Sequence, residues 1–157
     1  MSAVIEGHHD DHHHHGPAKG ISRWLFTTNH KDIGSLYLWF SFIMLFIGGA
    51  MAMVIRAELF EPGSQIVSPE FYNQMVTNHG LIMVFGVIMP AFVGFANWLV
   101  PMQIGAPDMA LPRLNNLSFW ILPAAFGVLI ATFFMEGGAP NFGWTFYAPL
   151  STEYAPP

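Results

Sequence analysis

The fold of this chain is decided by the stretch from Met75 to Asn116, MVTNHGLIMVFGVIMPAFVGFANWLVPMQIGAPDMALPRLNN. Its centre, residues 81–100, is a run of 20 residues without a formal charge. At ~1.5 Å per residue a helix of this length is ~30 Å long, which matches the hydrocarbon core of a bilayer. The stretch therefore predicts a transmembrane helix.

Polar residues stand at both ends of this helix. His79 precedes it, and Asn97 lies near its end, 18 residues later. At ~100° per residue this separation is a whole number of turns, so both side chains are expected on one face. Because polar groups are costly inside a membrane, this face is a functional hypothesis. The residues between them on this face are small or flexible: Met83, Gly86, Pro90 and Gly94.

The composition supports a membrane protein. Hydrophobic residues make up 53% of the 157 residues and charged residues only 10%, which is unusual for a soluble domain. With five Lys and Arg in total, the chain has little with which to bind nucleic acid phosphates. It contains no Cys, so disulfide frameworks and thiolate metal sites are excluded.

Two further apolar runs have the length of membrane spans. Residues 33–55 and 117–135 contain 23 and 19 residues without a charge. The connection 101–116 has three prolines and a glycine, so it cannot be one helix. We therefore predict an all-α membrane protein with transmembrane helices at 33–55, 81–100 and 117–135, embedded in a lipid bilayer.

Residues 1–20 form a polar, His-rich tail that we expect to be disordered. Six histidines, at positions 8, 9 and 12–15, would bind Zn, Ni or Cu adventitiously, or the tail is simply solvated.

The charge distribution predicts the topology. Under the positive-inside rule, the ends of the spans that carry most Lys and Arg lie in the cytoplasm. This places the N-terminus, the 101–116 connection and Asp108 on the cytoplasmic side, with His79 near the outer surface. Lys19, Arg23, Lys31 and Arg113 flank the first set of ends, and Arg56 alone flanks the other.

Two interpretations of His79 are open: an interfacial histidine that only makes hydrogen bonds, or a metal ligand. The small and flexible neighbours Gly80, Met83 and Gly86 favour a haem, because a macrocycle needs a wall of small side chains around its axial ligand. A second imidazole would have to come from elsewhere, since His30 lies at the opposite membrane surface, ~35 Å away along the first span.

Two loop clusters carry oxygen ligands. Asp108, followed by Asn115 and preceded by Asn97, is suited to collect protons at a channel mouth, or it caps a turn. The turn after the first span suits Ca²⁺ or Na⁺, or is a solvated loop. It contains Glu58, Glu61, Gly63 and Gln65.

Four long motifs resemble subunit I of the cytochrome c oxidases, in the haem–copper oxidase superfamily. They are TTNHKDIGSLY (27–37), IRAELFEPG (55–63), TNHG (77–80) and GFANWLVPMQIGAPDMALPRLNNLSFW (94–120). The resemblance covers the chain from Thr27 onward and leaves the His-rich tail outside. It implies that residues 21–157 are the N-terminal part of a bundle of roughly a dozen helices.

The resemblance implies a role for several residues at the predicted outer end. His79 would be one axial ligand of the low-spin haem a, with Met83 beside it, and Arg56 would hydrogen-bond the formyl group of that haem. Tyr72 and Trp144 would lie on its propionate side.

On the opposite side, Asp108 would be the entrance of the D proton channel, with Asn97, Asn115 and Tyr37 along its wall. The turn with Glu58, Gly63 and Gln65 resembles the family's Ca²⁺ or Na⁺ site. Glu61 stands in that turn where relatives often carry another residue.

The resemblance also implies the activity of the whole protein. Electrons would pass from cytochrome c through haem a to haem a3 and the copper centre CuB, where O2 is reduced to water with proton pumping. Subunits II and III would be partners in a bacterial inner (plasma) membrane, with cytochrome c docking through subunit II. The ligands of haem a3 and CuB are absent from these 157 residues, so we expect an N-terminal fragment that is inactive alone.

Two alternatives remain at this point. One is subunit I of a quinol oxidase, although RAELFEPG and TTNHKDIG are closer to the cytochrome c users. The other is a small three-helix membrane protein without catalysis. The coding sequence after Pro157 separates a fragment from a small protein.

Overall fold

The computed structural model describes residues 20–154, and the prediction for the His-rich tail falls almost entirely outside this range. This part of the chain is helical and contains no strand, as predicted. The elements are α1 (Ile21–Leu25), α2 (His30–Glu58), α3 (Pro69–Leu81), the π-helix η1 (Ile82–Ile88), α4 (Met89–Ile104), α5 (Pro112–Ala131) and the short 3-10 helix η2 (Thr132–Phe134).

Three helical stretches are long and apolar enough to cross a membrane, which confirms the predicted number. They are α2, the continuous run Pro69–Ile104, and Pro112–Phe134. The second helical stretch begins twelve residues before residue 81, where the predicted span starts, and the span bounds themselves stay a prediction. The polar first turns of this stretch are helical because Pro69 occupies the first turn and the Ser68 side chain accepts a hydrogen bond from the Phe71 amide.

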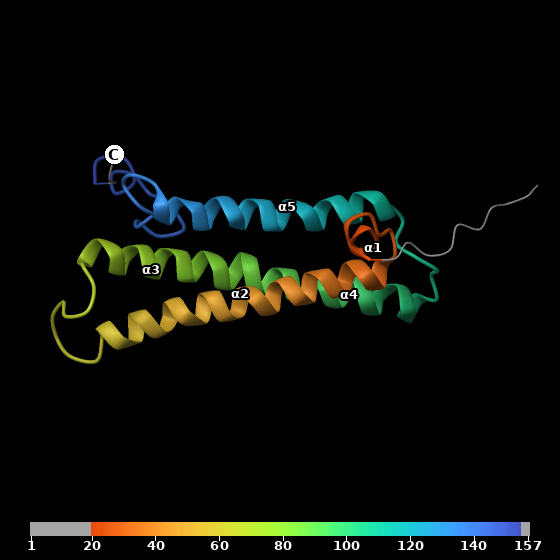
Figure 1. The fold of residues 1–157 in the computed structure, drawn as a ribbon, viewed down its shortest axis with the longest axis horizontal. Helices are drawn as coiled ribbons and strands as arrows, with labels where there is room; N and C mark the ends of the chain where they lie inside the picture. Colours follow the sequence, from red (N-terminus) through yellow and green to blue (C-terminus); the bar gives the residue numbers. More distant parts are fainter. Residues whose placement is uncertain (1–19, 155–157) are drawn as a thin grey trace, which may run out of the picture.

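Helix α2 contacts every other described helix except the short η2, which packs only on α5. It packs against α3, η1, α4 and α5, and the short α1 lies at its N-terminal end. In Figure 1 the three long stretches run side by side. The start of α2, the end of α4 and the start of α5 lie at one end of the bundle, which we call the Asp108 end. The α2–α3 connection and the end of α5 lie at the other, the His79 end.

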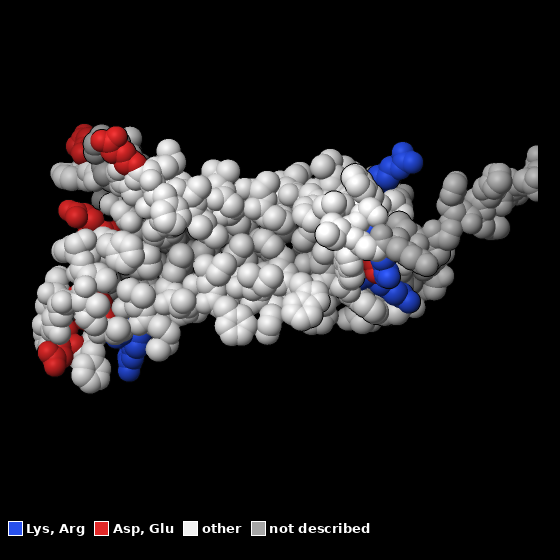
Figure 2. Space-filling model, viewed as in Figure 1, with Lys and Arg blue, Asp and Glu red and all other residues white. Residues whose placement is uncertain are grey.

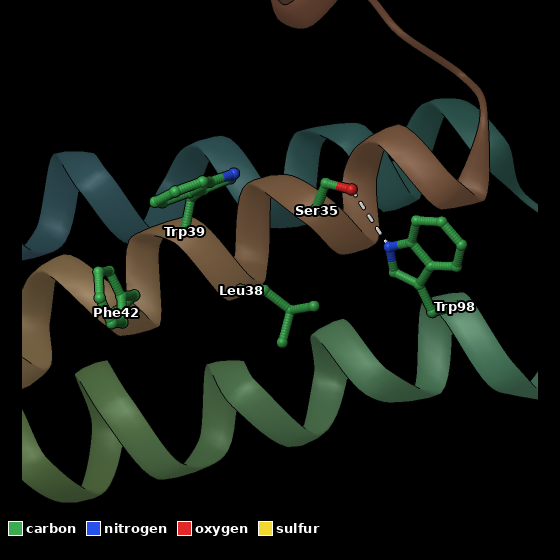
Figure 3. Close-up of a pocket in the computed structure, with 5 residues that line it drawn as sticks. All are labelled: Ser35, Leu38, Trp39, Phe42 and Trp98. Carbon is green, nitrogen blue, oxygen red and sulfur yellow. Dashed lines mark hydrogen bonds between the residues drawn. The ribbon is translucent and has the colours of Figure 1, made fainter.

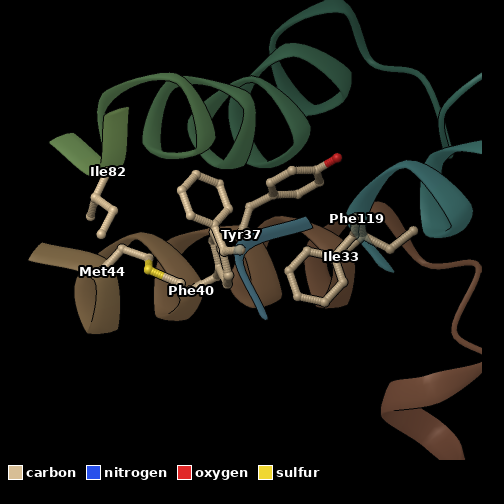
Figure 4. Close-up of a cluster of buried hydrophobic side chains, with 7 residues drawn as sticks. Ile33, Tyr37, Phe40, Met44, Ile82 and Phe119 are labelled. Carbon is tan, nitrogen blue, oxygen red and sulfur yellow. The ribbon is translucent and has the colours of Figure 1, made fainter. Parts of the chain in front are cut away.

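Aromatic side chains join α2 to α5 in the centre of the bundle (Figure 4). The ring of Phe119 meets those of Tyr37 and Phe40 edge to face, with centroids 5.2 and 6.3 Å apart. Such pairs add about 0.5–1.5 kcal/mol to the burial of their surface. The full cluster is Ile33, Tyr37, Phe40, Met44, Ile82, Phe119 and Phe126.

Helices α2 and α4 approach closely at a pair of glycines. A Cβ atom added to Gly34 would lie 2.6 Å from Cδ1 of Trp98 and 2.9 Å from the Gly94 carbonyl oxygen. One added to Gly94 would lie 2.9 Å from Cγ of Leu38. Small residues permit this contact between backbones, as is typical of helix pairs in membranes.

Charged side chains gather at the two ends of the bundle and leave its middle uncharged (Figure 2). Most Lys and Arg of the described chain lie at the Asp108 end, on α1, α2 and the start of α5, whereas most Asp and Glu lie at the His79 end. Two charged ends of this kind, separated by an uncharged belt, are what a membrane-spanning bundle requires.

Candidate functional site

A π-helical segment lies directly after His79, at Ile82–Ile88. Counting regular α-helical turns from His79 to Asn97 was therefore wrong, because a π-helix closes its bonds at i→i+5 and has wider turns. The segment is followed by Pro90, whose ring would clash with the Gly86 carbonyl in a regular α-helix. Ser41 of α2 donates a hydrogen bond to the Val87 carbonyl in the segment, at 2.8 Å.

The face predicted between His79 and Asn97 nevertheless lies against α2. Gly86, Pro90 and Gly94 are buried, and Ile82 takes the buried position at which Met83 was expected. Met83 is half-buried, and its Sδ atom would be 2.8 Å from a Cβ added to Gly48.

His79 is held by a backbone carbonyl. Its Nδ1 atom lies 2.9 Å from the carbonyl oxygen of Gly48 on α2. A carbonyl only accepts, so Nδ1 carries the hydrogen and the lone pair is on Nε2. This is the arrangement found in metal-bound histidines, where the second ring nitrogen is oriented by a hydrogen bond.

The surroundings of His79 leave room for a flat group. A Cβ added to Gly80 or Gly49 would meet nothing within 4 Å. Arg56, near the end of α2, is exposed and makes no hydrogen bond or ion pair with any residue from 20 to 154. The free imidazole nitrogen and the open glycines fit a haem that His79 would hold, and the Arg56 guanidinium at the same end of the bundle would be available to donate to it.

The loop after α5 is tied to α3 beside His79. Asn78 donates from Nδ2 to the Pro140 carbonyl oxygen at 3.1 Å, and the Thr77 hydroxyl accepts the Gly143 amide at 3.0 Å. These bonds bring Trp144 to the His79 end, where its ring lies 6.1 Å from that of Phe85. Tyr72 is half-buried on α3 at the same end. Thr77 and Asn78 were not predicted, and only their position beside His79 in TNHG could have indicated them.

The residues predicted for proton entry also come together, at the other end. Asn115 donates from Nδ2 to Oδ1 of Asn97 at 2.5 Å. His30 joins Asn97 to Asp108. Its Nδ1 atom lies 2.7 Å from the Asn97 carbonyl oxygen, and its backbone amide donates to Oδ1 of Asp108 at 3.2 Å. His30 was not predicted for this site, because it is 67 and 78 residues from its two partners.

Tyr37 lies further along the bundle and points away from solvent. Its hydroxyl is 2.9 Å from Oγ of Ser118, which donates in turn to the carbonyl oxygen of Asn115 at 2.7 Å. A chain of polar groups therefore runs from Asp108 through His30 and the two asparagines to Ser118 and Tyr37. Ser118, like His30, is a member that was not predicted.

The turn predicted for Ca²⁺ or Na⁺ is organised around Glu58. This carboxylate is buried and accepts the backbone amides of Gln65, Ile66 and Val67 at 2.7–3.1 Å. Glu61 is exposed. Between residues 20 and 154 no group of three His, Asp or Glu side chains is placed to hold a metal ion. The bonds of Glu58 account for an ordered loop without a cation, so the cation site stays a prediction.

These features define a class of protein: a multi-pass helical membrane protein with a histidine suited to bind haem at one end and a carboxylate-led polar chain at the other. The family comparison agrees with this class. The model described as "Cytochrome C and Quinol oxidase polypeptide I" matches residues 32–157, and the chain belongs to this family.

Its relatives are bacterial and archaeal oxidase subunits. The chain is 50% identical over 143 residues to "Probable cytochrome c oxidase subunit 1-alpha" of Streptomyces avermitilis, a match that covers 90% of this chain and 24% of the relative. It is 47% identical over 144 residues to "Cytochrome c oxidase subunit 1" of Corynebacterium diphtheriae, covering 90% and 26%. "Heme-copper oxidase subunit I+III" of Aeropyrum pernix is 48% identical over 137 residues, covering 87% and 17%. The chain thus spans about a quarter of the length of the first two relatives.

Proposed function

We propose that this chain is part of subunit I of a terminal oxidase that takes electrons from cytochrome c, and that it supplies one axial ligand of the low-spin haem a. The observation that carries the proposal is the hydrogen bond from Nδ1 of His79 to the Gly48 carbonyl oxygen. It leaves Nε2 free and orients the ring, as a haem ligand requires. When bound, haem a would supply one-electron transfer.

The other residues at the His79 end would position the haem. Arg56 would donate to its formyl group, since its guanidinium is exposed and unpaired within residues 20–154. Tyr72 and Trp144 would face its propionates, and Met83 would line its edge.

Proton uptake would begin at the opposite end, at Asp108. This carboxylate would collect protons, and the amides of Asn97 and Asn115 would order water without retaining the charge. The polar chain that continues to Ser118 and Tyr37 supports this role. In the full-length enzyme it would serve O2 reduction at haem a3 and CuB, coupled to pumping.

The charges at the two ends support an orientation in the membrane. The Asp108 end, with Arg23, Lys31 and Arg113, would face the cytoplasm of a bacterium, and the His79 end would face outward. Subunits II and III would cover part of the apolar surface of the bundle, with cytochrome c bound through subunit II.

The test is oxygen consumption by the full-length protein purified with its partner subunits. We expect turnover with reduced cytochrome c and a low-spin haem a spectrum. Turnover with a quinol and none with cytochrome c would assign the chain to the quinol oxidases instead. A full-length protein without haem and without turnover would reject the proposal and favour a non-catalytic membrane protein.

A further inference from the structure

A groove between α2 and α4 opens onto the outer surface of the described bundle. Figure 3 shows its lining residues, Ser35, Leu38, Trp39, Phe42 and Trp98. Its volume is about 410 Å³, within the range of small-molecule sites. Trp39 and Phe42 are 62% and 50% exposed, so the described chain leaves this groove uncovered.

The shape of the groove follows from the close approach of the two helices. Leu38 lies over Gly94, where it would contact an added Cβ atom at 2.9 Å, and so forms the floor. Trp39 and Phe42 form a wall on α2, with ring centroids 5.9 Å apart, and Trp98 forms the wall on α4. Large aromatic residues beside a glycine contact thus produce a trough that runs along the helices.

The polar atoms inside the groove are already satisfied. The Ser35 hydroxyl donates to the Lys31 carbonyl oxygen at 2.8 Å and accepts the indole N–H of Trp98 at 3.2 Å, the bond drawn in Figure 3. The remaining surface is hydrocarbon and aromatic. It therefore suits an acyl chain and offers no free donor or acceptor to a polar ligand.

A positive charge stands at the membrane-surface end of the groove. Nζ of Lys31 lies 6.0 Å from the centroid of the Trp98 ring. The neighbouring Asp32 is paired with Arg23 at 2.8 Å, and Lys31 has no ion-pair partner among residues 20–154. The groove continues from Ser35 to Phe42, ~10 Å deeper along α2.

We propose that this groove binds an anionic glycerophospholipid, with its phosphate at Lys31 and an acyl chain between Trp39, Phe42 and Trp98. The order of the groups fits the lipid: charge at the surface, then aromatic and aliphatic walls toward the middle of the membrane. A basic residue near a membrane surface contributes about fivefold to binding an anionic headgroup.

The experiment uses the full-length protein in lipid nanodiscs that contain phosphatidylglycerol with a photoactivatable group in one acyl chain. After irradiation, labelled peptides are identified by mass spectrometry. We expect labelling of the α2 and α4 peptides that contain Trp39 and Trp98. Phosphatidylcholine with the same photoactivatable chain should label them about fivefold less.

Two variants and two controls identify the contacts. Lys31→Gln should reduce labelling by phosphatidylglycerol about fivefold and leave that by phosphatidylcholine unchanged, whereas Arg113→Gln, at the same end of the bundle, should change neither. Trp39→Ala should reduce labelling by both lipids. Phe92→Ala, which removes a similarly exposed aromatic side chain outside the groove, should not.

Three results would overturn the proposal. Labelling that ignores the headgroup and Lys31 would show ordinary surrounding lipid. No labelling in the assembled protein would show that another helix of the full-length chain or of a partner subunit covers the groove. Crosslinks between two copies of the protein at Trp39 would show a second copy as the occupant.

Discussion

At the Asp108 end of the bundle the two asparagines, His30 and Asp108 are joined by hydrogen bonds, whereas at the His79 end one cation and one ring nitrogen have no partner among the described residues. Asn115 donates to Asn97, and His30 contacts both Asn97 and Asp108. At the His79 end, the Arg56 guanidinium has no partner within residues 20–154, and one nitrogen of His79 is free.

Three glycines on these helices also differ in how closely they are packed. Gly34, near the Asp108 end, is too tightly packed to accept a Cβ atom, while Gly49 and Gly80 have open space beside them. The hydrogen bonds at the Asp108 end join polar groups of the chain to one another, although Nδ2 of the nearby Asn116 has no partner among the described residues. Free groups beside open space indicate a site that is completed by something else. The first end therefore fits a proton path, and the second fits a cofactor site.

The largest expected effect is that of removing the free imidazole. In the full-length protein, His79→Ala should abolish the low-spin haem a spectrum, because no neighbouring side chain can replace the axial ligand. The measurement is the reduced-minus-oxidised visible spectrum with haem quantification. His30→Gln, at the Asp108 end, is the control and should keep the low-spin haem a spectrum. A normal low-spin spectrum in His79→Ala would mean that the ligand is elsewhere.

The second prediction concerns the Asp108 carboxylate at the Asp108 end. Asp108→Asn keeps an acceptor for the amides of His30 and Met109 but removes the titratable group. Turnover should fall at least about tenfold and pumping should be impaired, with unchanged haem spectra. Oxygen consumption and proton uptake by oriented vesicles measure this. Glu153→Gln, an exposed carboxylate at the other end, is the control. Unchanged uptake in Asp108→Asn would leave this residue as a loop cap.

The third prediction tests the difference in packing between the ends. Gly34→Ala places a methyl group 2.9 Å from the Gly94 carbonyl oxygen and should destabilise the bundle by about 1–3 kcal/mol. Gly49→Ala meets open space and should be neutral or stabilising by up to about 1 kcal/mol, since alanine favours the helix. Unfolding of the two variants in detergent gives the comparison. Equal stabilities would contradict the tight crossing of α2 and α4.

The fourth prediction separates a structural carboxylate from a cation ligand. Glu58→Gln should loosen the turn, because the neutral amide accepts the three backbone amides less strongly. Hydrogen exchange at residues 65–67 should then be faster, and Glu61→Gln, at an exposed residue, should change nothing. If Ca²⁺ slows the exchange in the wild-type protein and not in Glu61→Gln, the turn binds a cation after all.

The smallest effect is expected from the unpaired cation at the His79 end. Arg56→Met should leave the haem bound but shift its visible band, because the formyl group would lose a charged donor. Arg113→Met, at the opposite end, is the matched control. A band that shifts in neither variant would assign Arg56 to the membrane surface alone.

The sequence alone determined the number of membrane spans, the break in the 101–116 connection and the concentration of Lys and Arg at one end. These are properties of short stretches: apolar length is matched to the bilayer, and proline and glycine act on their own backbone. The family motifs are also local in the chain, which is why TNHG and the segment 94–120 carried the resemblance.

Only the tertiary structure decided how the polar groups are used. The His79 bond to Gly48 spans 31 residues of sequence, and the His30 bond to Asn97 spans 67. Ile82, and not Met83, is fully buried against α2, and the glycine crossing of α2 and α4 placed Trp98 beside Ser35. No local pattern encodes these contacts, because each depends on how two helices rotate and approach when they pack.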